Sequence, residues 1–181
     1  MSKIWKKSIE IPAGVELDIK GSTVNVKGPK GQLSHTFVQG VTIKVEGTQA
    51  ITTVENEDQR NFWGLSRTLL ANMIEGVTNG YKKKLLVMGV GYNVKMEGKK
   101  FTFALWLSHK INFDIPERIE AKVEQDIKWN FIITLNSIDK QYLWEFAAKV
   151  KALKKPEPYK GKWIRYFDEQ IKLKPGKAAK K

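Results

Sequence analysis

Apolar and polar residues alternate in short runs in the first part of the chain. The alternation covers residues 15–19 and 24–26, and the turn Lys20-Gly21-Ser22 separates the two runs. Strict alternation places every second side chain on the same face of a strand. The pattern therefore predicts a β-hairpin with one buried face, and a second hairpin of the same kind is predicted around Glu97-Gly98-Lys99.

Two later segments carry apolar residues at spacings of three and four, which is the period of a helix with one buried face. The first includes Phe62, Leu65, Leu69 and Met73, and the second includes Leu143, Phe146, Ala147, Val150 and Leu153. Glycine and proline disfavour a continued helix. We therefore expect the first helix to stop at Glu75-Gly76 and the second at Lys154-Lys155-Pro156.

The chain contains an internal repeat. An offset of 77 positions superposes the two predicted hairpins, with Gly14 over Gly91 and Gly21 over Gly98. The offset grows to 78 for residues 41–46 and to 81 for residues 58–70, as small insertions in surface loops would cause. We therefore predict an α+β protein of two duplicated units, each an antiparallel sheet packed against one helix, plus a basic C-terminal tail. The units are expected at residues 1–80 and 81–155, and the tail at 156–181.

Composition places the chain among soluble globular proteins. A hydrophobic content of 41% over 181 residues is enough to build buried cores. The sequence has no cysteine, so it offers neither disulfides nor thiolate metal ligands. No window approaches the roughly 20 apolar residues of a membrane helix, and residues 1–20 lack the apolar core of a signal peptide. We therefore expect a cytoplasmic protein with no membrane partner.

Positive charge gathers at the C-terminal end. From Lys149 to Lys181 there are twelve Lys or Arg against three acidic residues, which gives +9 of the formal net charge of +13. The run PEPYKGKWIRY, residues 156–166, interleaves aromatic rings with these cations. Surfaces that bind nucleic acid use cations for phosphates and flat rings for bases. The tail therefore predicts nucleic-acid binding, and because it buries little apolar surface we expect it to become ordered only on docking.

Candidate catalytic and metal-binding residues are few. Ser34-His35 and Ser108-His109 are the only Ser-His pairs. Neighbours on a strand point to opposite faces, so neither pair is expected to act as a nucleophile with its base. Two histidines do not form a structural zinc site by themselves. We expect no catalytic residue, no metal site and no cofactor.

Several motifs in one order resemble the bacterial-type ribosomal large-subunit protein six family. They are IEIPAGV at residues 9–15, VKGPKGQL at 26–33, RTLLANMIEGV at 67–77, GVGY at 89–92, the Ser-His pair at 108 and PEPYKGKWIRY at 156–166. The resemblance extends from Lys7 to about Lys177. It implies two duplicated α+β units, in agreement with the repeat.

The resemblance also implies a function. Members of the family are structural constituents of the large ribosomal subunit, and they bind its RNA mainly through the second unit and the tail. The implied position is near the sarcin-ricin loop and the base of the stalk, with other large-subunit proteins as neighbours and translational GTPases nearby. The RNA-binding residues carried over are Lys154, Lys155, Tyr159, Lys160, Gly161, Lys162, Trp163, Arg165, Tyr166 and Lys177.

The chain departs from the family at four positions. Trp106, Trp144 and Trp163 each stand where the family commonly has glycine, and Lys110 replaces the usual proline after Ser-His. Glycine at position 163 would let the backbone lie close to phosphate. An indole there must either stack on a nucleotide or push the loop outward, and the sequence leaves both readings open.

Two other functional classes would share a basic tail. A nuclease needs clustered carboxylates for a divalent metal or a positioned histidine, and neither constellation occurs in the sequence. A free-standing nucleic-acid chaperone would share the binding face without belonging to a stable particle. A non-enzymatic ribosomal RNA-binding protein is therefore the leading interpretation.

Overall fold

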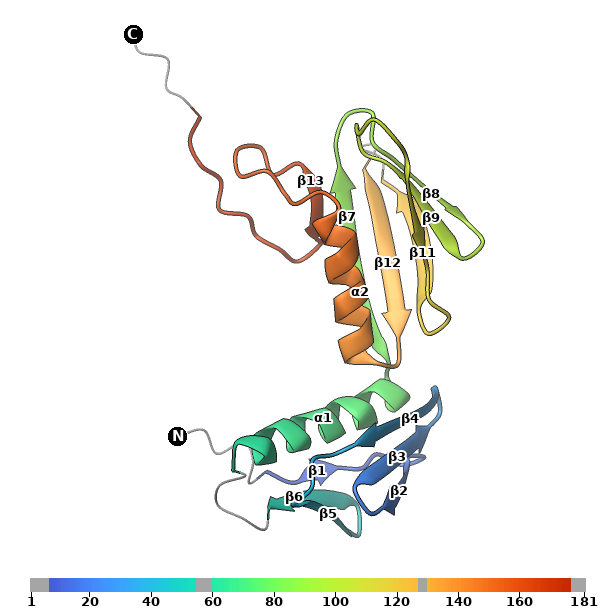
Figure 1. The fold of residues 1–181 in the computed structure, drawn as a ribbon, viewed down its shortest axis with the longest axis vertical. Coiled ribbons are helices and arrows are strands. Elements are labelled where there is room, and N and C mark those ends of the chain that lie inside the picture. The colour runs from blue at the N-terminus through green and yellow to red at the C-terminus, as the bar shows by residue number, and fades with distance from the viewer. Residues whose placement is uncertain (1–6, 55–59, 127–129, 177–181) are drawn as a thin grey trace. The chain divides into compact units, whose positions relative to one another are not determined.

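The computed structural model describes residues 7–54, 60–126 and 130–176 (Figure 1). The chain divides into two compact units, Met1–Tyr81 with Ile138–Lys140, and Lys82–Ser137 with Gln141–Lys181. The division follows Tyr81, one residue after the expected position. The C-terminal segment, which the sequence suggested as a separate extension, belongs to the second unit.

The first unit combines two three-stranded antiparallel sheets with one helix (Figure 1). The strand order is β1-β6-β5 in one sheet and β2-β3-β4 in the other. Its elements are β1 (Ile9–Glu10), β2 (Glu16–Lys20), β3 (Thr23–Gly28), β4 (Gly31–Thr36), β5 (Val41–Glu46), β6 (Gln49–Val54) and α1 (Arg60–Thr78).

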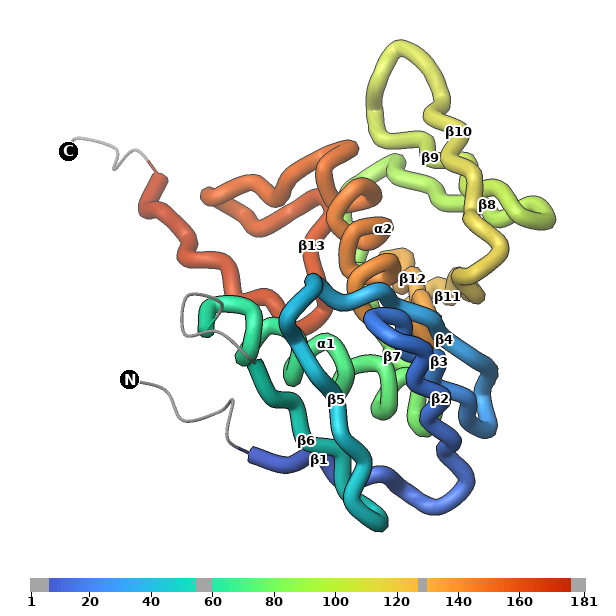
Figure 2. The backbone as a smooth tube through the Cα atoms, turned by 60° about the horizontal axis from the view of Figure 1, so that its bottom comes forward, coloured from blue at the N-terminus to red at the C-terminus, as the bar shows by residue number. Residues whose placement is uncertain are grey.

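The second unit has a three-stranded sheet of order β10-β9-β8, a four-stranded sheet of order β11-β12-β7-β13 and one helix. Its elements are β7 (Tyr81–Met88), β8 (Asn93–Glu97), β9 (Lys100–Ala104), β10 (Ile111–Asp114), β11 (Glu120–Gln125), β12 (Phe131–Ser137), α2 (Lys140–Ala152) and β13 (Trp163–Tyr166). Figure 2 shows the chain running from α2 through an extended loop into β13.

The predicted α+β class and the duplication are confirmed by the two strand orders. β1-β6-β5 corresponds to β7-β12-β11, and β2-β3-β4 corresponds to β8-β9-β10. Both predicted hairpins form, because Lys20 pairs with Thr23 and Glu97 pairs with Lys100. Gly21 and Gly98 take φ of 61° and 60° at the first central position of each turn, where a type II′ turn requires a positive φ. β13 has no described counterpart in the first unit.

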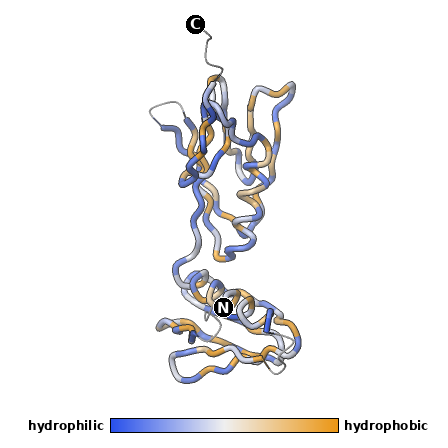
Figure 3. The backbone as a smooth tube through the Cα atoms, turned by 90° about the vertical axis from the view of Figure 1, so that its left-hand side faces the viewer, coloured by the Kyte–Doolittle hydropathy of each residue, from blue (hydrophilic) through white to orange (hydrophobic). Residues whose placement is uncertain are grey.

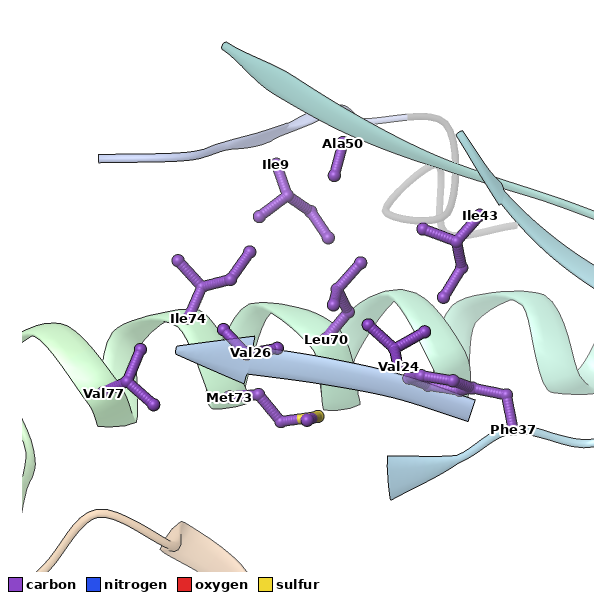
Figure 4. Packing of buried hydrophobic residues seen from close by; sticks show 10 residues of the cluster. All are labelled: Ile9, Val24, Val26, Phe37, Ile43, Ala50, Leu70, Met73, Ile74 and Val77. Atoms are coloured by element: carbon purple, nitrogen blue, oxygen red, sulfur yellow. The ribbon is translucent and has the colours of Figure 1, made fainter. Parts of the chain in front are cut away.

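The core of the first unit forms between α1 and the strands, as Figure 4 shows. Leu70, Met73, Ile74 and Val77 lie at helical spacing on α1 and are buried. Val24 and Val26 alternate on β3 and are almost completely buried against the same cluster. The alternation of hydrophobic and hydrophilic residues is visible along both units in Figure 3.

The end of α1 differs from the prediction. The helix continues through Gly76 to Thr78, and the chain leaves it before Gly80, which has a φ of 71°. The amides of Asn79 and Gly80 both donate to the carbonyl of Glu75 and close the last turn. Gly76 has a different role, because a Cβ there would lie 2.0 Å from the carbonyl oxygen of Ile138. The close approach of another segment explains this glycine.

The second helix ends at Ala152, two residues before the predicted stop signal begins. In the part of the chain that the structure describes, no helix is long and apolar enough to cross a membrane.

Candidate nucleic-acid interface

The predicted RNA-binding residues lie on the segment that leaves α2, and the structure separates them into two sets. Lys155, Tyr159 and Lys160 are exposed, with 53% of the Tyr159 surface accessible. The others in the described range are partly or wholly buried, and they are Lys154, Gly161, Lys162, Trp163, Arg165 and Tyr166. Lys177 lies outside the described residues.

The tail is anchored by strand β13, which extends the sheet of the second unit. Ile164 pairs with Val87 of β7 and is completely buried. Phe167 continues the contact, because its amide donates to the carbonyl of Lys84. The expectation of a tail that becomes ordered only on docking is therefore wrong for residues 163–167. The run WIRYF supplies a strand with a buried isoleucine, and the composition of the tail as a whole concealed it.

Lys154 is held inside the second unit and does not lie free for phosphate. Its ammonium lies 5.0 Å from the ring centre of Tyr92 and 5.1 Å from that of Trp163. It also donates a hydrogen bond of 2.7 Å to the carbonyl of Leu105. A cation between two rings gains about 0.5–2 kcal/mol per ring, depending on how far it is desolvated.

Two other rings of the tail, those of Tyr166 and Phe167, also lie close to cations of the same unit. The ammonium of Lys83 lies 4.8 Å from the ring centre of Tyr166, and that of Lys151 lies 4.6 Å from it. Lys84 lies over the ring of Phe167 at 5.5 Å. The mixture of aromatic and basic residues, which the sequence suggested as a surface for bases and phosphates, thus serves in large part to dock the tail.

A carboxylate completes this docking. Lys151 donates to both carboxylate oxygens of Glu169, at 2.6 and 2.7 Å, and the backbone amide of Tyr166 donates to the same carboxylate at 3.1 Å. Burial raises the pKa of Glu169, but the bonds from Lys151 and Tyr166 outweigh it, so the pKa lies below its ordinary value. The contact therefore favours the ionised carboxylate.

The Glu169 contact predicts an acid-sensitive tail. Because the pKa is lower in the folded state than in the unfolded state, the stabilisation is complete above the unfolded pKa and is lost as the pH falls through the folded pKa. We expect Glu169→Gln to reduce the free energy of unfolding by about 1 kcal/mol at neutral pH, with a difference from the parent that vanishes as the pH falls through the folded pKa of Glu169. Urea unfolding at several pH values measures this, and an equal difference at all pH values would contradict it.

Gly161 is covered by the chain itself. A Cβ at this position would lie 3.6 Å from Leu173 and 3.8 Å from Ile171, and the amide of Lys174 donates to the carbonyl of Pro158 at 2.8 Å. Gly161 is therefore buried under residues of its own unit. The φ of Gly161 is 66°, which allows the chain to turn in this loop. The amide of Gly161 donates to the carbonyl of Glu157, and the amide of Glu157 donates to the carbonyl of Lys162, so these two hydrogen bonds close the loop.

The fold brings two further cations to this loop that the motif comparison missed. Ile171 and Leu173 pack over Gly161, and Lys172 and Lys174 alternate with them and are exposed. The sequence IKLK carried the signal, because apolar and basic residues alternate in it. Within the described residues, no hydrogen bond or ion pair is recorded for the ammonium groups of Lys155, Lys160, Lys172 and Lys174.

Arg165 is the one arginine among the predicted RNA-binding residues. It is partly buried on β13 and pairs with Leu86 of β7. Its Nε is buried and has no hydrogen-bond partner in the described part of the chain. Its charge acts on Glu169, whose pKa it helps to lower. Arg165 therefore contributes to the docking of the tail, and its Nε is not exposed to solvent.

A cavity of about 930 Å³ opens beside the loop between β7 and β8. Gly89, Val90 and Gly91 form one wall, and Lys162 and Asn130 contribute polar groups. Gly89 lies against the ring of Tyr92, which is 2.8 Å from the place of a Cβ. The close contact with Tyr92 explains why position 89 is a glycine, and a phosphate-binding role is not needed to explain it.

The Ser-His pairs do not form a catalytic site. Ser34 and His35 lie on β4, as expected, but Ser108 and His109 lie in the loop between β9 and β10, with Oγ 3.3 Å from Nδ1. The argument from strand geometry was therefore wrong for the second pair. Both residues are exposed, and in the described ranges no carboxylate is bonded to the His109 ring to orient it as a base. Nor do these ranges hold a group of three His, Asp or Glu residues that could bind a metal.

Comparison with known proteins agrees with the repeated fold. The model of the family described as Ribosomal protein L6 matches residues 11–80 and 88–167, one segment in each unit. The chain is 44% identical over 183 residues to "Large ribosomal subunit protein uL6" of Alkaliphilus metalliredigens, covering 99% of this chain and 100% of that protein. It is 45% identical over 184 residues to the protein of the same description in Salinispora arenicola, with both chains covered completely. The chain therefore belongs to the ribosomal protein L6 family.

Proposed function

We propose that this chain is a structural, non-enzymatic constituent of the large ribosomal subunit that binds the RNA of that subunit through its second unit. The relatives reported above carry the large ribosomal subunit in their description. The charge distribution supports the assignment of the binding to the second unit, because residues 149–181 hold +9 of the +13 net charge.

The observation that carries the proposal is the set of exposed lysines on the segment after α2. Lys155, Lys160, Lys172 and Lys174 extend from a loop whose backbone is held by its own hydrogen bonds and by the packing over Gly161. Lys162, which is partly buried, lines the cavity beside the loop between β7 and β8. A held array of lysines meets phosphates as point charges without a large loss of backbone entropy.

The family resemblance supports a finer position for the bound protein. It implies a site near the sarcin-ricin loop and the stalk base, with other large-subunit proteins as neighbours and translational GTPases close by. Lysine in place of arginine favours contact with RNA backbone and shape over base reading. We therefore propose that the second unit recognises a folded RNA surface, and that Tyr159, with 53% of its surface exposed, offers the ring most accessible for stacking among the predicted residues.

A double substitution tests the role of the lysines. If two lysines neutralise phosphates, Lys160→Ala with Lys162→Ala should reduce the magnitude of the slope of log affinity against log salt by roughly 1.4–1.8. The measurement uses the full chain and a fragment of large-subunit RNA. A second readout is retention on large subunits during a high-salt wash, which the double variant should reduce.

The matched control removes the same charge elsewhere in the unit. Lys99 and Lys100 are exposed and pair with Glu117 at 2.9 Å and with Asp114 at 3.5 Å. Their double replacement by alanine should leave the slope close to that of the parent. Equal slopes for the parent and the Lys160, Lys162 variant would show that these lysines are solvated surface, and a parent that washes off the subunit would exclude a constituent of the particle.

A further inference from the structure

Two tryptophans hold backbone conformations that normally belong to glycine. Trp106 has a φ of 55° and Trp163 a φ of 88°, and among the described residues they are the only ones other than glycine with φ in the left-handed region. The Cβ of an L residue makes this region unfavourable, and bulky side chains are rare there. Such outliers persist where the surrounding structure fixes them.

The third tryptophan at a family glycine position behaves differently. Trp144 lies inside α2, where the backbone is helical, and is not among the residues with positive φ. Glycine is unfavourable in a helix interior. The backbone thus distinguishes positions 106 and 163 from position 144, although the sequence treats all three alike.

Both strained tryptophans are connected to Lys154, Trp163 through its ring and Trp106 through its neighbour Leu105. The ring centres of Trp163 and Tyr92 both lie close to the ammonium of Lys154, at 5.1 and 5.0 Å. Trp106 follows Leu105, whose carbonyl accepts the hydrogen bond from that ammonium. The loop after β7, the loop after β9 and the start of β13 therefore meet around one lysine.

Neither indole is well buried in return for the strain. Trp106 is 76% exposed, and its Nε1 would lie only 2.4 Å from a Cβ at Gly91. Trp163 is half-buried, and its recorded ring partner is Lys154. Removal of the Trp163 ring would therefore take one aromatic neighbour from the Lys154 cation, whereas the core residue Ile164 stays completely buried against β7.

We propose that positions 106 and 163 are glycine positions of this fold, and that with glycine at both the ammonium of Lys154 becomes a phosphate ligand for RNA. The second half rests on the proposed function. An ammonium has three donors, and the carbonyl of Leu105 takes one of them. The other two donors have no hydrogen-bond partner among the described residues, and replacement of Trp163 by glycine removes one of the two rings near them.

The experiment compares Trp106→Gly, Trp163→Gly and the double variant with the parent, each as the full chain. Relief of the left-handed strain should raise the urea midpoint in both single variants. The double variant should also bind a fragment of large-subunit RNA more tightly, with a salt slope steeper by about 0.7–0.9, which corresponds to one added phosphate contact. Lys154→Ala in the double variant should remove that increase.

Two controls separate the effects. Trp163→Ala removes the ring but keeps a Cβ at a φ of 88°, so it should match Trp163→Gly in RNA binding and fall below it in urea midpoint. Trp144→Gly places glycine in a helix and should lower the midpoint.

Three results would overturn the proposal. A Trp163→Gly chain no more stable than Trp163→Ala would show that the backbone at 163 has no requirement for glycine. Weaker RNA binding by the double variant would show that the indoles are stacking contacts, and an unchanged salt slope would exclude Lys154 as a phosphate ligand. If neither the parent nor the variants bind the RNA at low salt, the proposed function fails, and so does the proposal that Lys154 binds phosphate. The urea midpoints would still decide whether positions 106 and 163 require glycine.

Discussion

Ile164→Ala is expected to reduce the free energy of unfolding of the second unit by about 2–5 kcal/mol, the range for truncating a fully buried aliphatic side chain. Ile164 is completely buried where β13 pairs with β7. The loss should fall first on the tail, because β13 is an edge strand and the segment after it depends on the same docking. Hydrogen exchange of the Phe167 amide, which donates to Lys84, should therefore accelerate more than that of the central strands.

Tyr159 provides the control for this substitution. It lies on the same segment but is 53% exposed, so Tyr159→Ala should change the free energy of unfolding by no more than about 0.5 kcal/mol. Urea unfolding and proteolysis of the tail measure both variants. If Ile164→Ala leaves the midpoint and the rate of tail cleavage unchanged, β13 does not hold the tail in solution.

Gly76→Ala is expected to destabilise the first unit by about 3 kcal/mol or more, at the upper end of the overpacking range. A Cβ at position 76 would lie 2.0 Å from the carbonyl oxygen of Ile138, and that oxygen belongs to backbone that cannot rotate away. The helix would otherwise gain from the exchange, because alanine has the higher helix propensity. The steric conflict therefore has to exceed that gain before any destabilisation is seen.

The same helix offers a matched control. Gly64 also lies in α1, and a Cβ there would meet nothing within 4 Å. Gly64→Ala should stabilise the unit by about 0.5–1 kcal/mol, because only helix propensity and unfolded-state entropy change. Opposite signs for the two substitutions in thermal unfolding would establish the close approach at Gly76. A stabilising Gly76→Ala would contradict it.

Much of the fold could be predicted from the sequence because the signals are local or are repeated. The alternation around Gly21 and Gly98 reports which side of each hairpin is buried. The helical spacing placed Met73 on the buried face of α1, but Leu65 of the same predicted set is 51% exposed. The offset of 77 then relates one unit to the other without knowledge of any contact. These patterns predicted the α+β class and the duplication, which the strand orders confirm, whereas the family was predicted from the resemblance of several motifs and is confirmed by the family match.

The helix end at Gly76 could not be predicted in this way. A glycine near the end of an apolar run usually indicates a C-terminal cap. Here the residue is glycine because Ile138, which lies 62 positions later in the chain, approaches the helix backbone. The glycine that ends the helix is Gly80, four residues later in the chain, and its φ is positive as expected for a C-terminal cap.

The candidate site divides along the same line. The sequence by itself determined that the C-terminal segment is strongly basic, rich in rings and similar to the RNA-binding segment of one family. Only the tertiary structure decided which of those groups are accessible for binding. Lys154 and Tyr166 contact residues of β7 and of the loops after β7 and β9. Lys172 and Lys174 are instead brought near Lys160, because Ile171 and Leu173 pack over Gly161. The physical reason is that a lysine contributes the same charge at the same sequence position whether its ammonium faces an aromatic ring or solvent. Which of the two surroundings it has depends on contacts between residues far apart in the chain.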